Sequence, residues 1–148
     1  MKKFIQKAIM AIVCLVAFQT QAMADTDRPI TVNQLPATAQ QVIKSHFSGM
    51  KVALAKMETG FLEKSYDVIF TTGEKIEFDR DGNWTEIECK RTAVPAKLVP
   101  AQIANYVNTN YPGNSILKIE KDRTEYEINL SNGVEIKFNK EFMVIDID

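Results

Sequence analysis

The apolar positions of the chain change from helical spacing to strand spacing twice, in the same order each time. Apolar residues recur every three or four positions in two segments, which predicts two amphipathic helices. Their apolar stripes are Ala39, Val42, Ile43 and Phe47 in the first, and Ile103, Tyr106, Val107 and Tyr111 in the second. Pro36 and Pro100 suit the first helical position, where a missing N–H costs nothing. Each helix therefore needs a sheet to cover its stripe.

Each predicted helix is followed by segments in which apolar and polar residues alternate, the pattern of half-buried strands. Thr72-Gly73 and Asn132-Gly133 are typical hairpin turns between such segments. The predicted strands lie near residues 52–57, 66–70, 74–78 and 84–89 in the first half, and near 116–121, 126–130, 134–138 and 142–147 in the second.

The two halves match residue by residue. Leu35-Pro36-Ala37 corresponds to Val99-Pro100-Ala101 at an offset of 64, and Gly73 corresponds to Gly133 at an offset of 60. The sequence therefore predicts an α+β fold built by tandem duplication of a helix plus a three- to four-stranded antiparallel unit. The repeats span 35–90 and 99–148 of one domain, 35–148, with both helices on one face of a continuous antiparallel sheet. Residues 25–34 are a polar lead-in, expected to be partly disordered.

The first 24 residues have the pattern of a signal peptide. Three lysines precede an apolar run of 11 residues at 8–18, and Ala22-Met23-Ala24 supplies the small residues that signal peptidase requires. The run is too short for a membrane-spanning helix, which takes about 20 residues. Lipidation at Cys14 is the alternative, but Cys14 lies inside the run. We therefore expect cleavage after Ala24 and a periplasmic protein with no stable membrane insertion.

Cleavage would remove the three lysines and change the formal net charge from -1 to -4. Such a mildly acidic chain lacks the clustered basic face of a nucleic-acid-binding protein. Cys89 would be the single remaining cysteine, which excludes an intramolecular disulfide. Its place in the alternation with Ile87 predicts a buried thiol. No cofactor is expected.

Three longer segments resemble a known family. They are the Val-Pro-x-x-Ile-x-x-Tyr-Val-x-x-x-Tyr-Pro-Gly run at 99–113, the Tyr-Glu-Ile-x-Leu-x-Asn-Gly-x-Glu-Ile-x-Phe run at 126–138, and Phe-Asp-x-Asp-Gly-Asn-Trp at 78–84. They are similar to the PepSY-like, β-lactamase-inhibitor-like periplasmic proteins of Bacteroidetes. The resemblance covers the mature chain and implies two tandem repeats in one α+β domain. It carries over no activity and no binding residues, because the shared positions are turn and packing residues.

Helices on one face of a sheet leave the other face open, and residues there are candidates for binding. If Ile87 faces the helices, the alternation places Trp84 and Glu86 on the open face, and Ile69 joins them from another strand. An exposed tryptophan is a typical interface anchor. Trp84, Glu86 and Ile69 are therefore the predicted ligand- or protein-binding residues, with local packing of Trp84 across the hairpin as the alternative.

The segment Asp79-Arg80-Asp81-Gly82-Asn83 has oxygen ligands at alternate positions, as part of a calcium loop would. Its glycine comes too early for an EF-hand, and the segment joins two predicted strands. Aspartate and asparagine also favour turns for their own hydrogen bonds. A hairpin turn is the preferred interpretation, and calcium at Asp79, Asp81 and Asn83 is the alternative.

No catalytic motif accompanies these features. His46 is the only histidine, and it has no cysteine or paired carboxylates near it in the sequence that would make a zinc site. The favoured function is a non-enzymatic binding or inhibitor-type module acting through the open sheet face. Its partner would be a periplasmic protein, with a hydrolase or a peptidase among the candidates, or a cell-envelope ligand. The alternative is a hydrolase with an unrecognised site, in which carboxylates such as Glu86 and Glu88 act as acid and base.

Overall fold

The structure is a computed structural model that describes residues 26–148. The predicted signal segment, with Cys14 and the cleavage point after Ala24, lies outside these residues. The elements in chain order are β1 (Arg28–Ile30), the 3-10 turn η1 (Val32–Gln34), α1 (Ala37–His46), β2 (Val52–Thr59), β3 (Lys64–Phe70), β4 (Lys75–Phe78), β5 (Trp84–Glu88), the 3-10 turn η2 (Ala96–Leu98), α2 (Ala101–Asn110), β6 (Ile116–Lys121), β7 (Glu125–Leu130), β8 (Glu135–Asn139) and β9 (Val144–Ile147).

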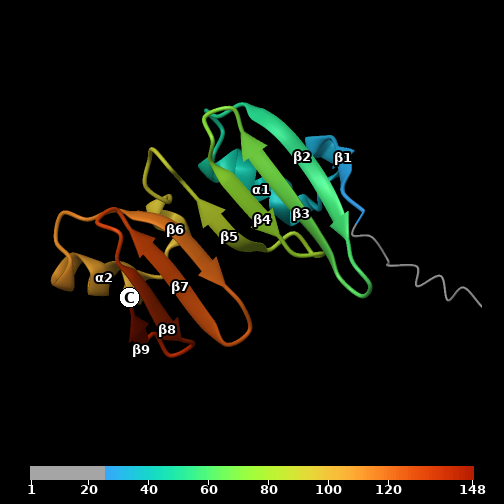
Figure 1. Ribbon diagram of the computed structural model, residues 1–148. Coiled ribbons are helices and arrows are strands. Elements are labelled where there is room, and N and C mark those ends of the chain that lie inside the picture. The colour runs from blue at the N-terminus through green and yellow to red at the C-terminus, as the bar shows by residue number, and fades with distance from the viewer. Residues whose placement is uncertain (1–25) are drawn as a thin grey trace, which may run out of the picture.

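The fold is α+β, as the hydropathy pattern predicts. The described strands form one nine-stranded antiparallel sheet whose spatial order is the order of the chain (Figure 1). α1 precedes β2 and α2 precedes β6, so each half of the sheet is a helix followed by four strands. Pro36 and Pro100 lie one position before the helices rather than at their first residue.

Both helices pack on the same face of the sheet. The ring of Phe47, after α1, stacks on Phe70 with centroids 5.3 Å apart, and Tyr106 of α2 meets Phe138 edge-on at 5.4 Å. A row of directly opposed apolar residues crosses this face from β2 to β9: Ala55, Val68, Ile76, Ile87, Ile119, Ile128, Ile136 and Ile147. All members but Ile147 are buried. The core thus runs the length of the sheet under the two helices.

The lead-in is structured, so the expectation of partial disorder is wrong for residues 28–34. β1 pairs with β2, with Ile30 opposite Ala55, and Ile30 packs against the core. Thr31 and Gln34 then form a capping box around η1. Although the segment is mostly polar, its two aliphatic residues, Ile30 of β1 and Val32 of η1, pack against the core and tie it to the sheet.

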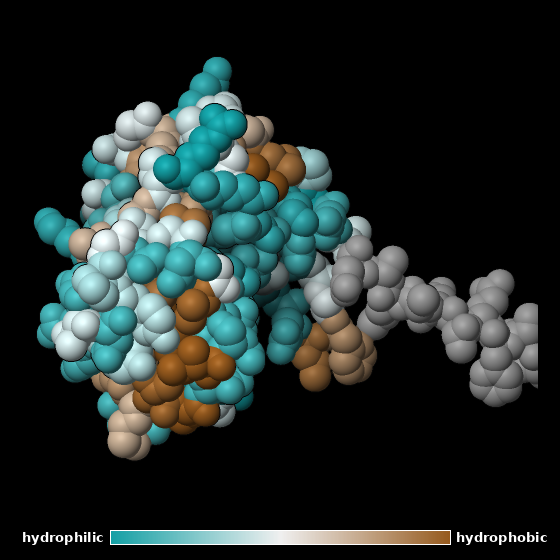
Figure 2. Space-filling view, turned by 60° about the vertical axis from the view of Figure 1, so that its left-hand side comes forward, coloured by the Kyte–Doolittle hydropathy of each residue, from teal (hydrophilic) through white to brown (hydrophobic). Residues whose placement is uncertain are grey.

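The opposite edge of the sheet is apolar and exposed. Ile145 and Ile147 of β9 are 53% and 47% exposed, and Met143 just before them is 59% exposed. Figure 2 turns this end of the molecule toward the viewer and shows a brown area over β9.

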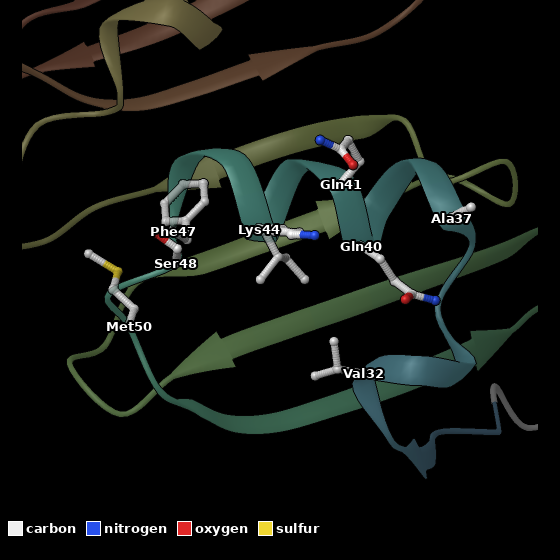
Figure 3. A pocket seen from close by; sticks show the side chains of 9 residues that line it. Val32, Ala37, Gln40, Gln41, Lys44, Phe47, Ser48 and Met50 are labelled. Atoms are coloured by element: carbon white, nitrogen blue, oxygen red, sulfur yellow. The ribbon is translucent and has the colours of Figure 1, made fainter.

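A groove of about 510 Å³ lies between α1 and the lead-in (Figure 3). Val32 and Met50 line its apolar part, and Gln40 and Lys44 of α1 line its polar part. Gln40 closes one end by donating hydrogen bonds to the carbonyl oxygens of Asn33 and Leu35. The nine described residues that line the groove include no carboxylate, histidine or cysteine, so it offers no acid–base pair.

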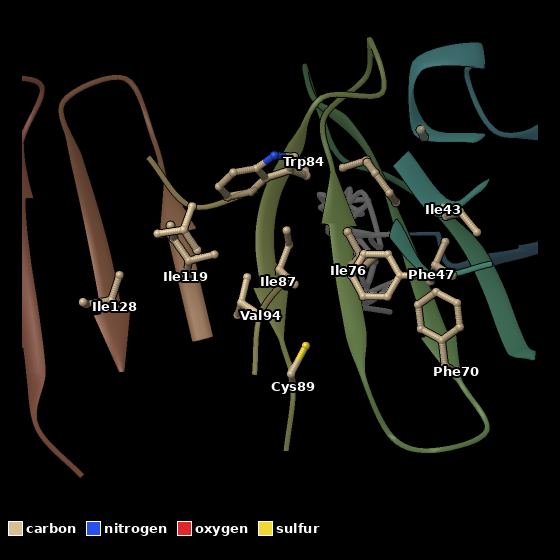
Figure 4. Packing of buried hydrophobic residues seen from close by; sticks show 14 of the residues in the cluster. Ile43, Phe47, Phe70, Ile76, Trp84, Ile87, Cys89, Val94, Ile119 and Ile128 are labelled. Carbon is tan, nitrogen blue, oxygen red and sulfur yellow. The ribbon is translucent and has the colours of Figure 1, made fainter. Parts of the chain in front are cut away.

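Trp84 lies on the helix-covered face, contrary to the strand alternation. A bulge in β5 skips Thr85, so that Phe78 pairs with Trp84 while Glu77 pairs with Glu86. The extra residue moves Trp84 to the face that carries Ile87, where only 9% of it is exposed (Figure 4). The Nζ of Lys121 lies over the ring, 3.8 Å from its centroid, in cation–π geometry. Trp84 therefore packs locally opposite Phe78 across the β4–β5 hairpin, which was the alternative interpretation of this residue.

Cys89 is buried, as predicted from its alternation with Ile87. Burial, together with the nearby carboxylate of Glu74, raises the pKa of the Cys89 thiol to about 11. The thiol is therefore neutral at physiological pH and is a poor nucleophile.

Candidate functional site: the uncovered face of the sheet

The face of the sheet opposite the helices is lined by polar and charged side chains. Successive side chains of a strand point to opposite faces, so the polar residues that alternate with the core residues lie here. A row directly opposed across neighbouring strands runs over the middle of this face. It consists of Lys56, Asp67, Glu77, Glu86, Glu120, Glu127, Lys137 and Asp146. The five central members, from Asp67 to Glu127, are all acidic, and we call them the acidic row.

The acidic row places like charges directly opposite each other on five adjacent strands. Glu86 of β5 lies opposite Glu77 on one side and Glu120 on the other. Like charges in this position destabilise a sheet, since the side chains stand only about 5 Å apart. The arrangement therefore costs stability, and folding alone does not call for it.

Four lysines partly compensate the acidic row. Lys118 Nζ lies 3.1 Å from Glu86 Oε2 and 3.2 Å from Glu120 Oε2. The buried carboxylate of Asp67 is held between Lys56 and Lys75, each with Nζ 3.4 Å from Oδ2. Lys137 Nζ is 3.6 Å from Glu127 Oε2. Further carboxylates, Glu58, Glu88 and Glu135, flank the row on the same face, so acids remain in excess.

The environment raises the pKa of two carboxyl groups in the row. Partial burial raises the pKa of Glu86, and Glu77 and Glu120 add to the effect, against the attraction of Lys118. Partial burial likewise raises the pKa of Glu127, with Glu135 adding repulsion and Lys137 opposing it. Both groups are thus less stable as anions here than in water.

A shallow depression of about 430 Å³ lies on this face beside the row. It collects Glu88, Glu127 and Glu135 together with Lys118. His46 is distant from it in the chain, at the end of α1, and is half-buried there. Of the two carboxylates named for the hydrolase alternative, Glu88 lines the depression and Glu86 does not, and none of the described lining residues is a histidine.

Two of the three predicted binding residues lie on the uncovered face. Glu86 is at the centre of the acidic row, and Ile69 lies on β3 directly opposite Leu54 of β2, which is 40% exposed. Leu54 and Ile69 form a small apolar pair at one end of the face. Trp84, the third, lies behind β5 on the covered face, because of the bulge at Thr85. The binding role of all three stays a prediction.

The Asp79 segment forms a turn that uses its own carboxylate. Asp79 Oδ1 accepts the backbone N–H groups of Asp81 and Asn83, each at 2.9 Å. Partial burial alone would raise the pKa of Asp79, but these hydrogen bonds outweigh it and lower the pKa. In the second half the uncharged Asn139 accepts the N–H groups of Glu141 and Met143 in the same way. A charge is therefore not required for the turn to form.

Within residues 26–148, no group of three or more histidine, cysteine, aspartate or glutamate side chains is arranged to hold a metal ion. Calcium at Asp79, Asp81 and Asn83 stays a prediction.

Sequence reasoning missed a pair of exposed apolar residues at the tip of the β2–β3 hairpin. Phe61 is 76% exposed and Leu62 is 83% exposed. Adjacent large apolar residues in a turn, after Gly60 and before Glu63, were the available signal, since a tight turn gives them no core to enter. The tip stands apart from the acidic row.

Comparison with known proteins agrees with this architecture. The family described as "Putative beta-lactamase-inhibitor-like, PepSY-like" matches residues 64–146, which include the acidic row. The chain belongs to the PepSY-like family. Among curated proteins, a search gives no match.

Three solved Bacteroides structures are similar to this PepSY-like chain. A "putative periplasmic protein" of Bacteroides vulgatus is 62% identical, with a TM-score of 0.83 over 84% of this chain and 98% of its own. A "putative calcium-regulated periplasmic protein" of Bacteroides thetaiotaomicron is 59% identical, with a TM-score of 0.81 over 82% and 96%. A second Bacteroides vulgatus protein, "of unknown function", is 38% identical, with a TM-score of 0.79 over 83% and 99%. The relatives are thus described as periplasmic.

In residues 26–148 of this chain, no helix has the length and apolarity to cross a bilayer.

The raised pKa of Glu86 predicts that replacing this residue with uncharged glutamine stabilises the fold at neutral pH but not at acidic pH. A carboxyl group whose pKa is higher in the folded state stabilises the fold below its unfolded pKa of about 4.5, and this contribution is lost as pH rises through the folded pKa. In this PepSY-like chain, Glu86→Gln should therefore raise the free energy of unfolding at pH 7 by about 0.5 kcal/mol and change it little below pH 4. Urea unfolding at both pH values measures the difference.

Glu88→Gln is the matched control for that prediction. Glu88 lies opposite Lys75 and Lys118, so removing its charge should lower stability at pH 7 rather than raise it. A loss of stability in Glu86→Gln at pH 7 would show that the Lys118 ion pair outweighs the like-charge repulsion, against our interpretation of the acidic row.

Proposed function

We propose that this PepSY-like protein is a non-enzymatic, inhibitor-type binding module of the periplasm. The uncovered sheet face is its binding surface, and its partner is a protein that presents a basic surface. The proposed partner is a periplasmic hydrolase or peptidase, because an inhibitor-type module binds over the active site of an enzyme. The inhibitor-like family and the absence of a recognised catalytic motif in the sequence support the proposal.

The acidic row carries the proposal. Five opposed carboxylates on adjacent strands cost stability in the isolated protein, and sites that trade stability in this way are characteristic of function. A partner's lysine or arginine side chains would relieve the repulsion at Glu86 and Glu120 on binding. Charge complementarity of this kind steers association and excludes wrong partners.

Ile69 and Glu86 are the proposed contact residues, with Leu54 extending the apolar end of the face. This pairing gives the surface both a charged centre and an apolar margin. Trp84 supports the site from behind, because its packing in the core holds β5, the strand that carries Glu86. Phe61 and Leu62 lie outside this proposed contact.

Calcium binding is the second candidate function. The 59%-identical Bacteroides thetaiotaomicron protein is described as calcium-regulated, and this chain has carboxylates both in the acidic row and at Asp79 and Asp81. Calcium is a hard cation that takes oxygen ligands of this type. A rise in melting temperature with CaCl2, absent with NaCl of equal ionic strength and lost in Asp79→Asn/Asp81→Asn, would establish it at the turn.

Two further proposals concern how the chain is made. Cleavage after Ala24 would leave Asp25 as the mature N-terminus, and the intact mass of the exported protein measures it. A tandem duplication of the helix-plus-four-strand unit would explain the correspondence of the two halves. The matching hydrogen bonds of the Asp79 and Asn139 turns support that origin.

The binding proposal is tested by charge removal on the face, matched by charge removal elsewhere. The test variant is Glu77→Gln/Glu86→Gln/Glu120→Gln, and the control is Glu63→Gln/Asp122→Asn/Glu141→Gln, which removes three exposed charges in turns. Each protein, residues 25–148, is immobilised and exposed to periplasmic extract of Bacteroides thetaiotaomicron. We expect a protein captured by wild type and control, released by salt, and not captured by the test variant. Equal capture by all three baits would refute the binding role of the acidic row.

A further inference from the structure

β9 is the counterpart of β5, but it lacks the neighbour that β5 has. The two strands correspond at an offset of 60, down to the bulge that skips Thr85 in one and Ile145 in the other. β5 is covered along its outer edge by β6, with Ile87 opposite Ile119. In the described part of the chain, nothing pairs with the outer edge of β9.

Because β9 has no outer neighbour, the apolar position that is buried in β5 is exposed in β9. Ile87 is fully buried, whereas its counterpart Ile147 is 47% exposed although it ends the same apolar row. The neighbouring Ile145 is 53% exposed. An exposed, apolar edge strand is a template for pairing with another strand.

The backbone of β9 is also arranged for such pairing. The backbone N–H and C=O of Asp148 both bond to Glu135 of β8. In an antiparallel pair the next residue along the strand points the other way, so Ile147 directs its N–H and C=O away from β8. The Ile147 N–H is occupied locally by Asp146 Oδ1 at 3.1 Å. An incoming strand could replace this bond with a backbone carbonyl.

The charges along β9 indicate what kind of strand would fit. Asp146 and Asp148 flank Ile147 and correspond to Glu86 and Glu88 of β5. In β6, Lys118 lies opposite Glu88 and its Nζ is 3.1 Å from Glu86. A second copy of β9 paired over the same three positions would oppose Asp146 to Asp148 twice, and such like-charge pairs are unfavourable.

We propose that the outer edge of β9 binds an extended peptide segment of a partner protein by strand addition, and that this segment carries a β-branched apolar residue next to lysine. Backbone hydrogen bonds to Ile147 provide affinity, the apolar residue covers Ile147 as Ile119 covers Ile87, and the lysine pairs with Asp146 and Asp148. This mode is independent of the acidic row and goes beyond the proposed function.

The chain supplies its own probe, because β6 already fills this role beside β5. A synthetic peptide with the sequence of residues 114–123 is titrated into the protein, residues 25–148, and binding is followed by calorimetry. We expect binding to wild type and roughly tenfold weaker binding to Ile147→Pro, which removes the outward N–H but leaves the β8 hydrogen bonds of Asp148 in place. Asp146→Lys/Asp148→Lys should weaken it similarly, whereas Ile147→Val should not.

Two controls separate this site from others. The Glu77→Gln/Glu86→Gln/Glu120→Gln variant should bind the peptide as wild type does, and a peptide with Glu in place of Lys118 should bind more weakly. Circular dichroism verifies that each variant is folded. Failure of wild type to bind millimolar peptide, or undiminished binding by Ile147→Pro, overturns the proposal. A dimer that dissociates in Ile147→Pro would overturn it in favour of a second copy as the occupant.

Discussion

Replacing Trp84 by alanine is expected to lower the free energy of unfolding by about 3–5 kcal/mol, because the ring lies in the core on the helix-covered face. Its removal leaves a cavity beside Phe78 and takes away the surface on which Lys121 rests. Urea unfolding of wild type and variant measures the loss, provided both unfold in a single transition.

Two comparisons make this prediction specific. Trp84→Phe keeps most of the buried apolar area and should recover more than half of the stability that the alanine variant loses. Thr85→Ala changes the bulged residue, which is only half-buried, and should cost less than about 1 kcal/mol. If Trp84→Ala also costs less than about 1 kcal/mol, the ring lies on the uncovered face as the alternation predicted, and the bulge is misplaced.

Gly82→Ala is expected to cost about 3 kcal/mol or more. Gly82 has a φ of +86°, a left-handed conformation that costs an alanine roughly 1–2 kcal/mol. A Cβ there would also lie 2.7 Å from the Cβ of Pro36 and 2.9 Å from the backbone nitrogen of Ala39. Neither the rigid proline ring nor the helix backbone can move aside easily. The close approach holds the β4–β5 turn against the start of α1.

Gly73→Ala separates the two contributions. Gly73 has a φ of +97° in the β3–β4 turn, but a Cβ added there would have no atom beyond its chain neighbours within 4 Å. We expect only the backbone cost of roughly 1–2 kcal/mol. Thermal unfolding of both variants gives the difference. Equal losses would mean that the turn at Gly82 does not pack against α1 as closely as the structure shows.

Much of the fold follows from local sequence. Pro36 and Pro100 mark the helix starts to within one residue, and Asn132-Gly133 marks a hairpin, because these residues act through their own backbone preferences. The bulge at Thr85 could not be predicted in this way. It depends on how β5 meets β4, and the sequence of alternating residues is compatible with either register. For the same reason, the sequence could not predict the face of the sheet on which Trp84 lies.

The candidate site shows the same division. Alternation alone places Glu86 and Ile69 on the uncovered face, since no bulge separates them from residues whose burial is evident. The acidic row required the register of five strands, because Glu77, Glu86 and Glu120 are far apart in sequence and meet only through pairing. The exposure of Ile147 likewise depends on β9 being the last strand of the sheet.

The central claim is that the uncovered, acidic face is the binding surface. Its most direct test is amide chemical-shift mapping of the 15N-labelled protein, residues 25–148, with the partner captured from periplasmic extract. We predict that the largest shifts fall on the strands of the acidic row, around Glu86 and Lys118, and that they decrease with added salt. Shifts confined to α1 and α2, on the helix-covered side, would contradict the claim.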